Sequence, residues 1–397
     1  MSKGTSKYDV IVVGGGASGL MCAISAGYRG LRVLVLEQGP KVGLKILVSG
    51  GGRCNFTNTF ADPREHYLSQ NPNFCISAMK RFSPSDFIQM VETAGIDYHE
   101  KKLGQLFCDH SAKEIVTMLL EQCSYAGVEI RLRQAVTSIS PEAALGFTVA
   151  TQDSQYAGRK VVIASGGLSM PKIASDLAFR TAKELSLKLN PTRAALVPLT
   201  WSSSDKVRYE SLSGISTEVI ASCQGHSFRE NLLFTHRGLS GPAILQISSF
   251  WREGQAVDIN LLPDRNAGEW LAAAREDNPQ QRLLSVLKTQ LPNRLVDLMS
   301  GSWFEDQKIG SFSPPEIADM GRRLNHWSFM PGGSEGYRTA EVTLGGIDTD
   351  EVSSKTFELK RVPGLFAIGE ALDVTGWLGG YNFQWAWASG WCCGQHL

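Results

Sequence analysis

A glycine-rich turn near the amino terminus has the residue types that bind a dinucleotide. Gly14, Gly16 and Gly19 form a GxGxxG motif, and Glu37 follows at the usual distance of about twenty residues. The first glycine permits a tight turn, the second lets the backbone approach a pyrophosphate, and the third lets a helix pack close to a strand. Glu37 can accept hydrogen bonds from the hydroxyl groups of an adenosine ribose, and its charge would repel a 2′-phosphate.

The elements that must position this turn follow in order. Residues 8–13 are a short β-branched run typical of a buried parallel strand, residues 20–28 are helical, and residues 31–36 form a second strand. A lone GxGxxG is also compatible with a merely structural turn, but this complete unit favours a pyrophosphate bound at the helix amino terminus. The residues expected to contact FAD here are Gly14, Gly16, Ala17, Ser18, Gly19, Glu37 and Gln38.

A second glycine-rich segment comes directly after the second strand. Its three consecutive glycines let the backbone pass close to a planar ring that polar neighbours can orient, so we expect contact with the flavin; a simple glycine linker is the alternative. The residues expected at the cofactor are Lys45, Ser49, Gly50, Gly51, Gly52, Arg53, Cys54 and Asn55. Cys54 has no second cysteine nearby in the sequence, so we expect a bystander thiol rather than a redox pair.

Three later segments can complete an FAD site. Residues 160–164 form a strand that leads into small residues, residues 365–370 form a strand that closes on glycine and an acid, and residues 376–382 open an apolar helix. The amino terminus of that helix offers N–H groups to the flavin or to phosphate; a packing helix behind a flexible loop is the alternative. The residues expected to contact the cofactor here are Ala164, Ser165, Gly166, Gly369, Asp373, Gly380, Tyr381, Asn382 and, on a hairpin strand expected over 135–140, Val136.

The composition excludes several classes of protein. Of 397 residues, 39 are basic and 39 are acidic, and no window is dense enough in Lys and Arg to follow a phosphate backbone, so we expect no nucleic-acid partner. A signal peptide and an apolar stretch of about 18 residues are both absent, which predicts no membrane association and a cytoplasmic location. The eight cysteines show no CxxC spacing, so we expect reduced thiols and no metal site.

The chain is long enough for two domains, or for one domain with an insertion. From about residue 192, the segments 195–199, 216–221 and 255–260 read as strands of a separate antiparallel unit, and 266–325 is mostly helical. Dinucleotide-fold signals resume at residue 340. We therefore expect an FAD-binding domain whose first part is 1–191, an inserted domain over 192–330, and the last part of the FAD-binding domain over 331–397.

Four separated motifs resemble those of the BaiN/YhiN-type bacterial flavoproteins. They are residues 49–55, 233–242, 340–347 and 369–390, so the resemblance extends over essentially the whole chain. It implies a Rossmann-type α/β FAD-binding domain like that of glutathione reductase, with an inserted β-barrel and helical domain. It also implies an NAD(P)/FAD-dependent oxidoreductase whose substrate is poorly defined; one member resembles a reductase of unsaturated steroid ketones.

These observations predict an enzyme that passes hydride from NADH or NADPH through flavin N5 to a small organic acceptor such as an activated alkene or ketone. Only one GxGxxG is present, so the nicotinamide must visit the flavin transiently. We expect catalytic roles for His236, which could donate a proton, and Arg237, which could hold an anionic group. Their loop, residues 233–242, is expected to face the flavin across a cleft.

Three alternatives remain open at this point. The first is an oxidase or dehydrogenase of small amines or alcohols, and the second is an FAD-dependent RNA modifier, against which the neutral charge counts. The third is a flavin-binding sensor without turnover. The sequence assigns no oligomeric state.

Overall fold

The computed structural model describes residues 8–142 and 146–397, which form two compact units. Unit 1 comprises the chain up to Arg193 together with Val342–Leu397, and unit 2 comprises Ala194–Glu341. The expected insertion ended at residue 330, whereas unit 2 extends further because β18 (Gly333–Ser334) still pairs with its sheet.

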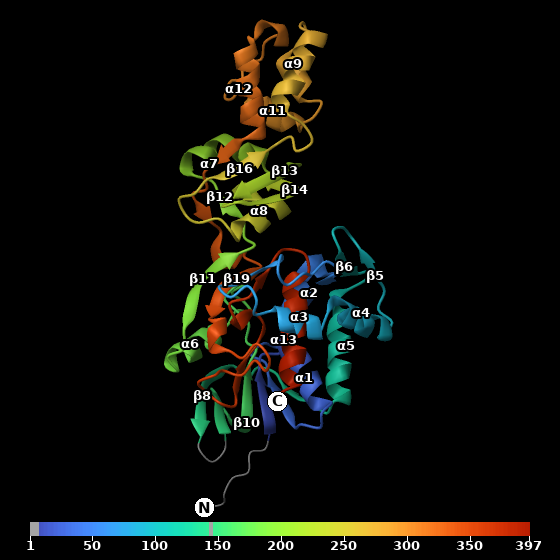
Figure 1. Cartoon of the computed structure of the whole chain (residues 1–397), viewed down its shortest axis with the longest axis vertical. Helices are drawn as coiled ribbons and strands as arrows, with labels where there is room; N and C mark the ends of the chain where they lie inside the picture. Colours follow the sequence, from blue (N-terminus) through green and yellow to red (C-terminus); the bar gives the residue numbers. More distant parts are fainter. Residues whose placement is uncertain (1–7, 143–145) are drawn as a thin grey trace, which may run out of the picture. The chain divides into compact units, whose positions relative to one another are not determined.

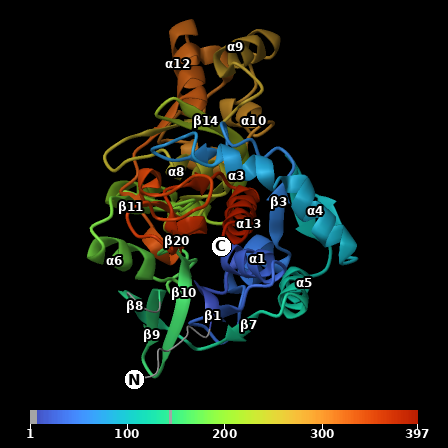
Figure 2. The same ribbon diagram turned by 60° about the horizontal axis from the view of Figure 1, so that its bottom comes forward.

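A parallel sheet forms the centre of unit 1 (Figures 1 and 2). Its parallel strands are β1 (Tyr8–Val13), β2 (Val33–Leu36), β7 (Glu129–Arg131), β10 (Gln155–Ile163) and β20 (Leu365–Ala367). The order is β7-β2-β1-β10, with β20 also paired to β10. The antiparallel strands β8 (Val136–Glu142) and β9 (Gly146–Thr151) extend the sheet, and Figure 2 shows them at the edge opposite β7. The apolar strands β2 and β20 are buried throughout, as expected for a sheet covered on both faces.

Two helices from opposite ends of the chain pack against each other over this sheet. They are α1 (Ala17–Gly27) and α13 (Tyr381–Gly394), which lie side by side in Figure 1. Their contact requires a glycine, because a Cβ atom on Gly390 would lie 2.3 Å from the carbonyl oxygen of Ser18. A further helix, α5 (Ala112–Tyr125), packs on α1 and begins with a capping box between Ser111 and Glu114.

Shorter elements complete unit 1 around the glycine-rich loops. They are α2 (Leu44–Val48), β3 (Asn55–Asn58), β4 (Tyr67–Leu68), α3 (Ile76–Arg81), α4 (Pro84–Thr93), β5 (Tyr98–Glu100), β6 (Gln105–Cys108), α6 (Leu177–Glu184), β11 (Leu189–Ala195), β19 (Val342–Ile347) and β21 (Thr375–Gly376). Strands β3, β6 and β5 form one small sheet, β4 pairs with β21, and β11 pairs with β19.

Unit 2 is built on one seven-stranded sheet with the order β17-β16-β13-β14-β15-β12-β18. Its elements are β12 (Leu199–Thr200), α7 (Ser203–Tyr209), β13 (Ser216–Cys223), β14 (His226–Phe234), β15 (Gly238–Ser240), α8 (Pro242–Ser248), β16 (Val257–Asn260), α9 (Ala267–Asp277), α10 (Leu283–Leu287), α11 (Asn293–Met299), α12 (Pro314–Asn325), β17 (Trp327–Phe329) and β18. The strand expected over 195–199 is interrupted at 196–198, between the end of β11 and the start of β12, because Leu196 has a φ of 50° and Pro198 lacks an N–H group. Across the described ranges of both units, every helix is too short or too polar to cross a bilayer.

The contact between α1 and α13 makes Gly390→Ala a test of the fold. Alanine favours a helix by about 1 kcal/mol over glycine, but the methyl group would meet backbone that cannot move away easily. We expect the free energy of unfolding to fall by about 1–3 kcal/mol in urea titrations. Gly268→Ala in α9 is the matched control, because the nearest atom to a Cβ there is a side-chain oxygen of Asn266 at 3.3 Å, and it should lower stability less than Gly390→Ala does. Equal stability of the two variants would contradict this account of the packing.

Candidate functional site

The GxGxxG turn joins β1 to α1 and leaves an open surface at the helix amino terminus. A Cβ on Gly19 would lie 1.9 Å from the carbonyl oxygen of Gly14, so the third glycine serves backbone packing. A Cβ on Gly16 would meet no protein atom within 4 Å, and no side chain caps α1. The first-turn N–H groups at Ala17 and Ser18 are therefore available to an anion such as a pyrophosphate.

Glu37 lies at the carboxyl end of β2, next to the turn. Its Oε2 accepts a hydrogen bond from the Gly15 N–H (2.8 Å) and its Oε1 accepts one from the Gly39 N–H (2.6 Å). The backbone N–H of Gln134 donates to the Glu37 carbonyl, which brings the start of β8, and with it Val136, close to Glu37. Each carboxylate oxygen keeps a second lone pair, so the group can still accept from a ribose hydroxyl.

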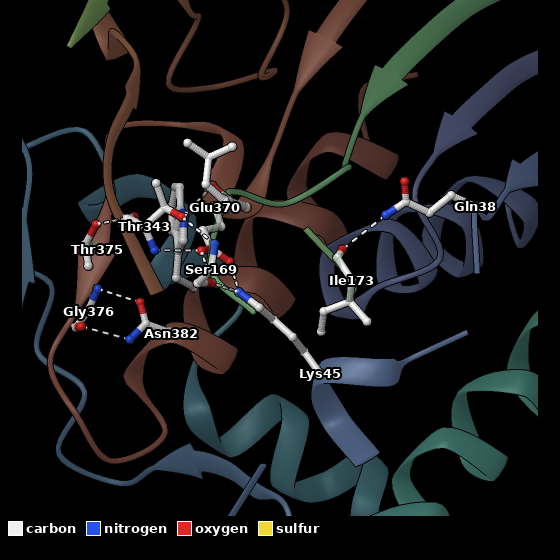
Figure 3. Close-up of polar contacts among 12 residues, drawn as sticks. Gln38, Lys45, Ser169, Ile173, Thr343, Glu370, Thr375, Gly376 and Asn382 are labelled. Carbon is white, nitrogen blue, oxygen red and sulfur yellow. Dashed lines mark hydrogen bonds and ion pairs between the residues drawn. The ribbon is translucent and has the colours of Figure 1, made fainter. Parts of the chain in front are cut away.

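Gln38 links the same region to the segment that follows β10. Its side-chain amide donates to the carbonyl oxygens of Ile173 (3.1 Å) and Ala174 (3.3 Å), the first of which is drawn in Figure 3. In that segment Ala164 is buried beside Gly14, and Gly166 has a φ of 74° with open space where a Cβ would be. The end of β10 therefore borders the GxGxxG turn.

The segment after β10 also contains a buried polar atom that the protein leaves unpaired. The Oγ atom of Ser165 has no hydrogen-bond partner within the described residues. A buried hydroxyl without a partner carries a desolvation penalty that a ligand could remove. Ser165, Gly16 and Gly166 together fit a bound dinucleotide.

The loop of three glycines forms a tight, left-handed turn between α2 and β3. Gly50, Gly51 and Gly52 have φ values of 57°, 67° and 87°, a region that side chains disfavour. A Cβ on Gly51 or Gly52 would meet nothing within 4 Å, so this face of the loop is open. The turn closes through a hydrogen bond from the Cys54 N–H to the Ser49 carbonyl (3.1 Å), and the Arg53 side chain is exposed.

Cys54 is fully buried, and burial raises the pKa of its thiol. The thiol is therefore protonated at neutral pH and unsuited to attack a substrate. All eight cysteines are free and buried.

Lys45 belongs to a polar cluster that joins four segments of the chain (Figure 3). Its ammonium group donates to Ser169 Oγ (2.7 Å) and pairs with Glu370 (2.5 Å). Glu370 also accepts from Ser169 Oγ (3.1 Å) and from the Thr343 N–H (2.8 Å). The sequence predicted Lys45 at the flavin but gave no indication of Ser169 or Thr343. The one sign of this cluster in the sequence was Glu370, the acid after Gly369.

The glycine loop before α13 is closed by an asparagine. Asn382 accepts from the Gly376 N–H (2.8 Å) and donates to the Gly376 carbonyl (2.8 Å), as Figure 3 shows. Gly380 has a φ of 94°, and no side chain caps α13. With its amide oriented to satisfy both polar atoms, Asn55 accepts from the Gly380 N–H (3.2 Å), which joins this loop to the one at 49–55.

Tyr381 begins α13 and stacks on a histidine that sequence reasoning missed. The ring centroids of Tyr381 and His66 are 4.6 Å apart, with 14° between their planes. Burial raises the pKa of Tyr381 to about 12 and lowers the pKa of His66. The His66 Nδ1 atom accepts from the Asp62 N–H (3.2 Å), so its proton is placed on Nε2. Nothing in the sequence near residue 66 distinguishes this histidine from a structural one.

Gly369 and Asp373 lie beyond β20 in different surroundings. A Cβ on Gly369 would approach Ser18 Oγ to 2.6 Å, so the end of β20 adjoins the start of α1. Asp373 is buried and accepts from the Gln70 N–H (2.9 Å) and the Asn190 side chain (2.8 Å), and burial raises its pKa. Its contacts serve to hold chain segments together.

His236 and Arg237 lie in unit 2, whereas the other candidate residues lie in unit 1. They form the exposed turn between β14 and β15, which Thr235 closes through its hydroxyl and the Gly238 carbonyl (3.0 Å). Arg237 pairs with Glu335 (3.4 Å). Both side chains therefore reach solvent from a tight turn.

Comparisons with known proteins agree with this geometry. The model of the family described as HI0933-like protein Rossmann domain matches residues 8–396. The ribosomal RNA dihydrouridine synthase of Escherichia coli (strain K12) is 49% identical over 401 residues, 98% of each chain. The ribosomal RNA dihydrouridine synthase of Haemophilus influenzae is 46% identical over 393 residues, 96% of each chain.

More distant similarities point to the same fold. The 3-dehydro-bile acid delta(4,6)-reductase of Clostridium scindens is 28% identical over 412 residues, 97% of each chain. The solved structure of 3-ketosteroid-delta4-(5alpha)-dehydrogenase from Rhodococcus jostii RHA1 superposes with a TM-score of 0.50 at 15% identity, covering 98% of this chain and 97% of that one. This last likeness concerns the fold alone.

Two expectations from the sequence are wrong. The first is the reduction of a small organic acceptor. Two relatives, at 49% and 46% identity, are named for a reaction on ribosomal RNA, which also counts against the amine or alcohol oxidase and the non-catalytic sensor. The expected absence of a nucleic-acid partner disagrees with the same names. Net charge misled because it sums over the whole chain, whereas contact with RNA depends on the side chains of one surface.

The family model matches nearly the full length of the chain. This match, together with the two relatives and the geometry of the GxGxxG turn, leads to one assignment. The chain belongs to the HI0933-like Rossmann-domain family of FAD-binding oxidoreductases, which includes the BaiN/YhiN-type flavoproteins.

Proposed function

We propose that this protein reduces uridine in ribosomal RNA to dihydrouridine. The observation that carries the proposal is the 49% identity, over 98% of both chains, to a protein named for that reaction. Identity at this level extends through both units, so it includes the parts of the chain that would hold the cofactor and the parts that would meet the RNA.

The reaction adds one hydride and one proton to a carbon–carbon double bond. In uracil this bond joins C5 and C6 and is conjugated with the C4 carbonyl, so hydride adds at C6 and the proton at C5. Bound FAD, when reduced, would supply the hydride. NADH or NADPH is the reductant that we propose, and the single GxGxxG motif is consistent with transient binding of that nucleotide.

The chain's own residues have three tasks in this scheme. The open turn at Gly16 and the free N–H groups of α1 would hold the pyrophosphate, and Glu37 would accept from the ribose. The loops at 49–55 and 376–382, already hydrogen-bonded to each other, would enclose the flavin. The Lys45–Glu370 ion pair holds together the two segments that lead into these loops.

The central test is direct. Purified protein, given unmodified ribosomal RNA transcribed in vitro and either NADH or NADPH under nitrogen, should form dihydrouridine. Nucleoside mass spectrometry detects the two added hydrogens, and flavin absorbance identifies the reductant that bleaches the cofactor. RNA left unmodified by protein that is fully loaded with FAD and bleached by a nicotinamide would refute the proposed substrate.

Gly16→Val tests the position of the cofactor. The side chain has room within the protein, and Gly16 has an ordinary φ of −84°, so the fold should persist. Valine would occupy the path of the pyrophosphate, and we expect FAD affinity to fall about tenfold or more, measured by equilibrium dialysis. Gly127→Asn, in an open left-handed turn after α5, should keep its FAD. Full FAD occupancy in a folded Gly16→Val protein would place the pyrophosphate elsewhere.

We also propose that His236 and Arg237 contact the RNA substrate. The double variant His236→Ala/Arg237→Ala should retain FAD, because both side chains belong to unit 2, while dihydrouridine formation slows about tenfold or more. His226→Ala/Arg229→Ala is the matched control, since it removes another exposed histidine and arginine from β14. Equal rates for the two double variants would remove this turn from the substrate site.

A further inference from the structure

An exposed apolar patch lies on unit 1 at the tip of the β5–β6 hairpin, which is labelled in Figure 1. Phe60 is 61% exposed and Leu103 is 59% exposed. The turns that carry them touch, because a Cβ on Gly104, the residue after Leu103, would lie 2.7 Å from the Phe60 ring. Among the exposed large apolar side chains of residues 8–142 and 146–397, Phe60 is the one phenylalanine. An exposed ring and an exposed aliphatic chain on adjoining turns make a candidate binding surface.

A single buried amide holds this patch in place. Asn58 is fully buried, and its Nδ2 donates to the carbonyl oxygens of Leu103 (3.0 Å) and Gly379 (2.9 Å). Its Oδ1 accepts from the Phe60 N–H (2.8 Å). One side chain therefore connects the turn that bears Phe60, the tip that bears Leu103 and the glycine loop before α13.

The backbone adds to this rigidity. The Thr59 N–H donates to the Gly104 carbonyl (2.9 Å), and Gly104 has a φ of 74°. A Cβ there would also lie 2.6 Å from Thr59 Oγ1, so only glycine allows the two turns to touch. A surface that is already ordered loses little conformational entropy when a partner binds.

The charges around the patch fit an anionic partner. Lys101 is exposed, with its ammonium group 5.3 Å from the centre of the Phe107 ring, and Arg53 in the neighbouring glycine loop is exposed as well. Two carboxylates, Glu100 and Asp62, also lie nearby and keep their negative charge; each accepts a hydrogen bond from a backbone N–H, of Gly104 (2.9 Å) and of Arg64 (2.7 Å).

We propose that Phe60 and Leu103 form a stacking platform for an unpaired base of the RNA, with Lys101 and Arg53 contacting adjacent phosphates. This inference rests on the proposed function. Proteins bind unpaired RNA by stacking bases on aromatic rings, and an enzyme that acts on a base must take it out of its stack. Through Asn58 the platform adjoins the 376–382 loop, so a base held there would neighbour the uridine at the flavin.

The test compares RNA affinity with FAD content in variants of the full chain. Phe60→Ala should raise the Kd for unmodified ribosomal RNA about fivefold or more, while Phe60→Trp keeps the wild-type value. Tyr125→Ala, at a 73% exposed aromatic on α5, is the matched control and should bind normally. Lys101→Gln should reduce the slope of log Kd against log salt by about one. FAD occupancy should be equal in all four variants.

The outcomes separate the platform from the function on which it rests. If wild-type protein forms dihydrouridine and Phe60→Ala binds RNA as tightly, the platform is refuted and the function stands. If wild-type protein loaded with FAD neither binds nor modifies the RNA, the proposed function fails. Should Phe60→Ala lose FAD, Phe60→Leu decides, because it keeps apolar volume and removes the ring: unchanged RNA affinity would refute stacking.

Discussion

Helices α1 and α13 meet at Gly390, where a Cβ atom would collide with the carbonyl oxygen of Ser18. The two helices come from opposite ends of the chain, so this contact closes unit 1. It brings Gly369 against the start of α1, while the 376–382 loop that leads into α13 lies against Thr57 and Gln105. Each glycine-rich segment expected at the cofactor depends on this closure for its neighbours, because none of them forms a site within its own stretch of sequence.

Most polar side chains around these loops form hydrogen bonds that fix the positions of backbone segments. Asn382 closes one loop on Gly376, Asn58 joins three segments, and Glu370 receives Lys45, Ser169 and the Thr343 N–H. Around these loops, the described residues leave the uncapped start of two helices and the unpaired Ser165 Oγ for a ligand. A site organised in this way has its donors in place before the ligand arrives, which lowers the cost of binding.

The sequence predicted those features that local residues determine. The GxGxxG unit and its flanking strands are of this kind, because the first strand, the spaced glycines, the second strand and Glu37 all lie in one stretch, residues 8–37. Lys45 and Glu370 are 325 residues apart in the sequence, and Asn58 and Gly379 are 321 residues apart. No local sequence pattern can therefore predict these contacts. The helix at residue 20 begins earlier, at Ala17, because Gly16 allows the chain to enter the helix directly from the turn. The expectation of no nucleic-acid partner, which the names of the two relatives contradict, rested on a balanced sum of charges, and such a sum does not show where individual basic side chains lie.

The chain leaves unit 1 through β11 and returns through β19, and these two strands pair with each other. In evolutionary terms, unit 2 is an insertion whose two connections to unit 1 lie side by side. Insertions, deletions and substitutions within unit 2 can therefore accumulate without changing the path of the chain through the dinucleotide-binding unit. Such a layout lets unit 2 diverge in sequence while the dinucleotide-binding half keeps its connections. Relatives named for a ribosomal RNA and for a bile acid, both aligned over nearly the whole of this chain, are the divergence that such an architecture permits.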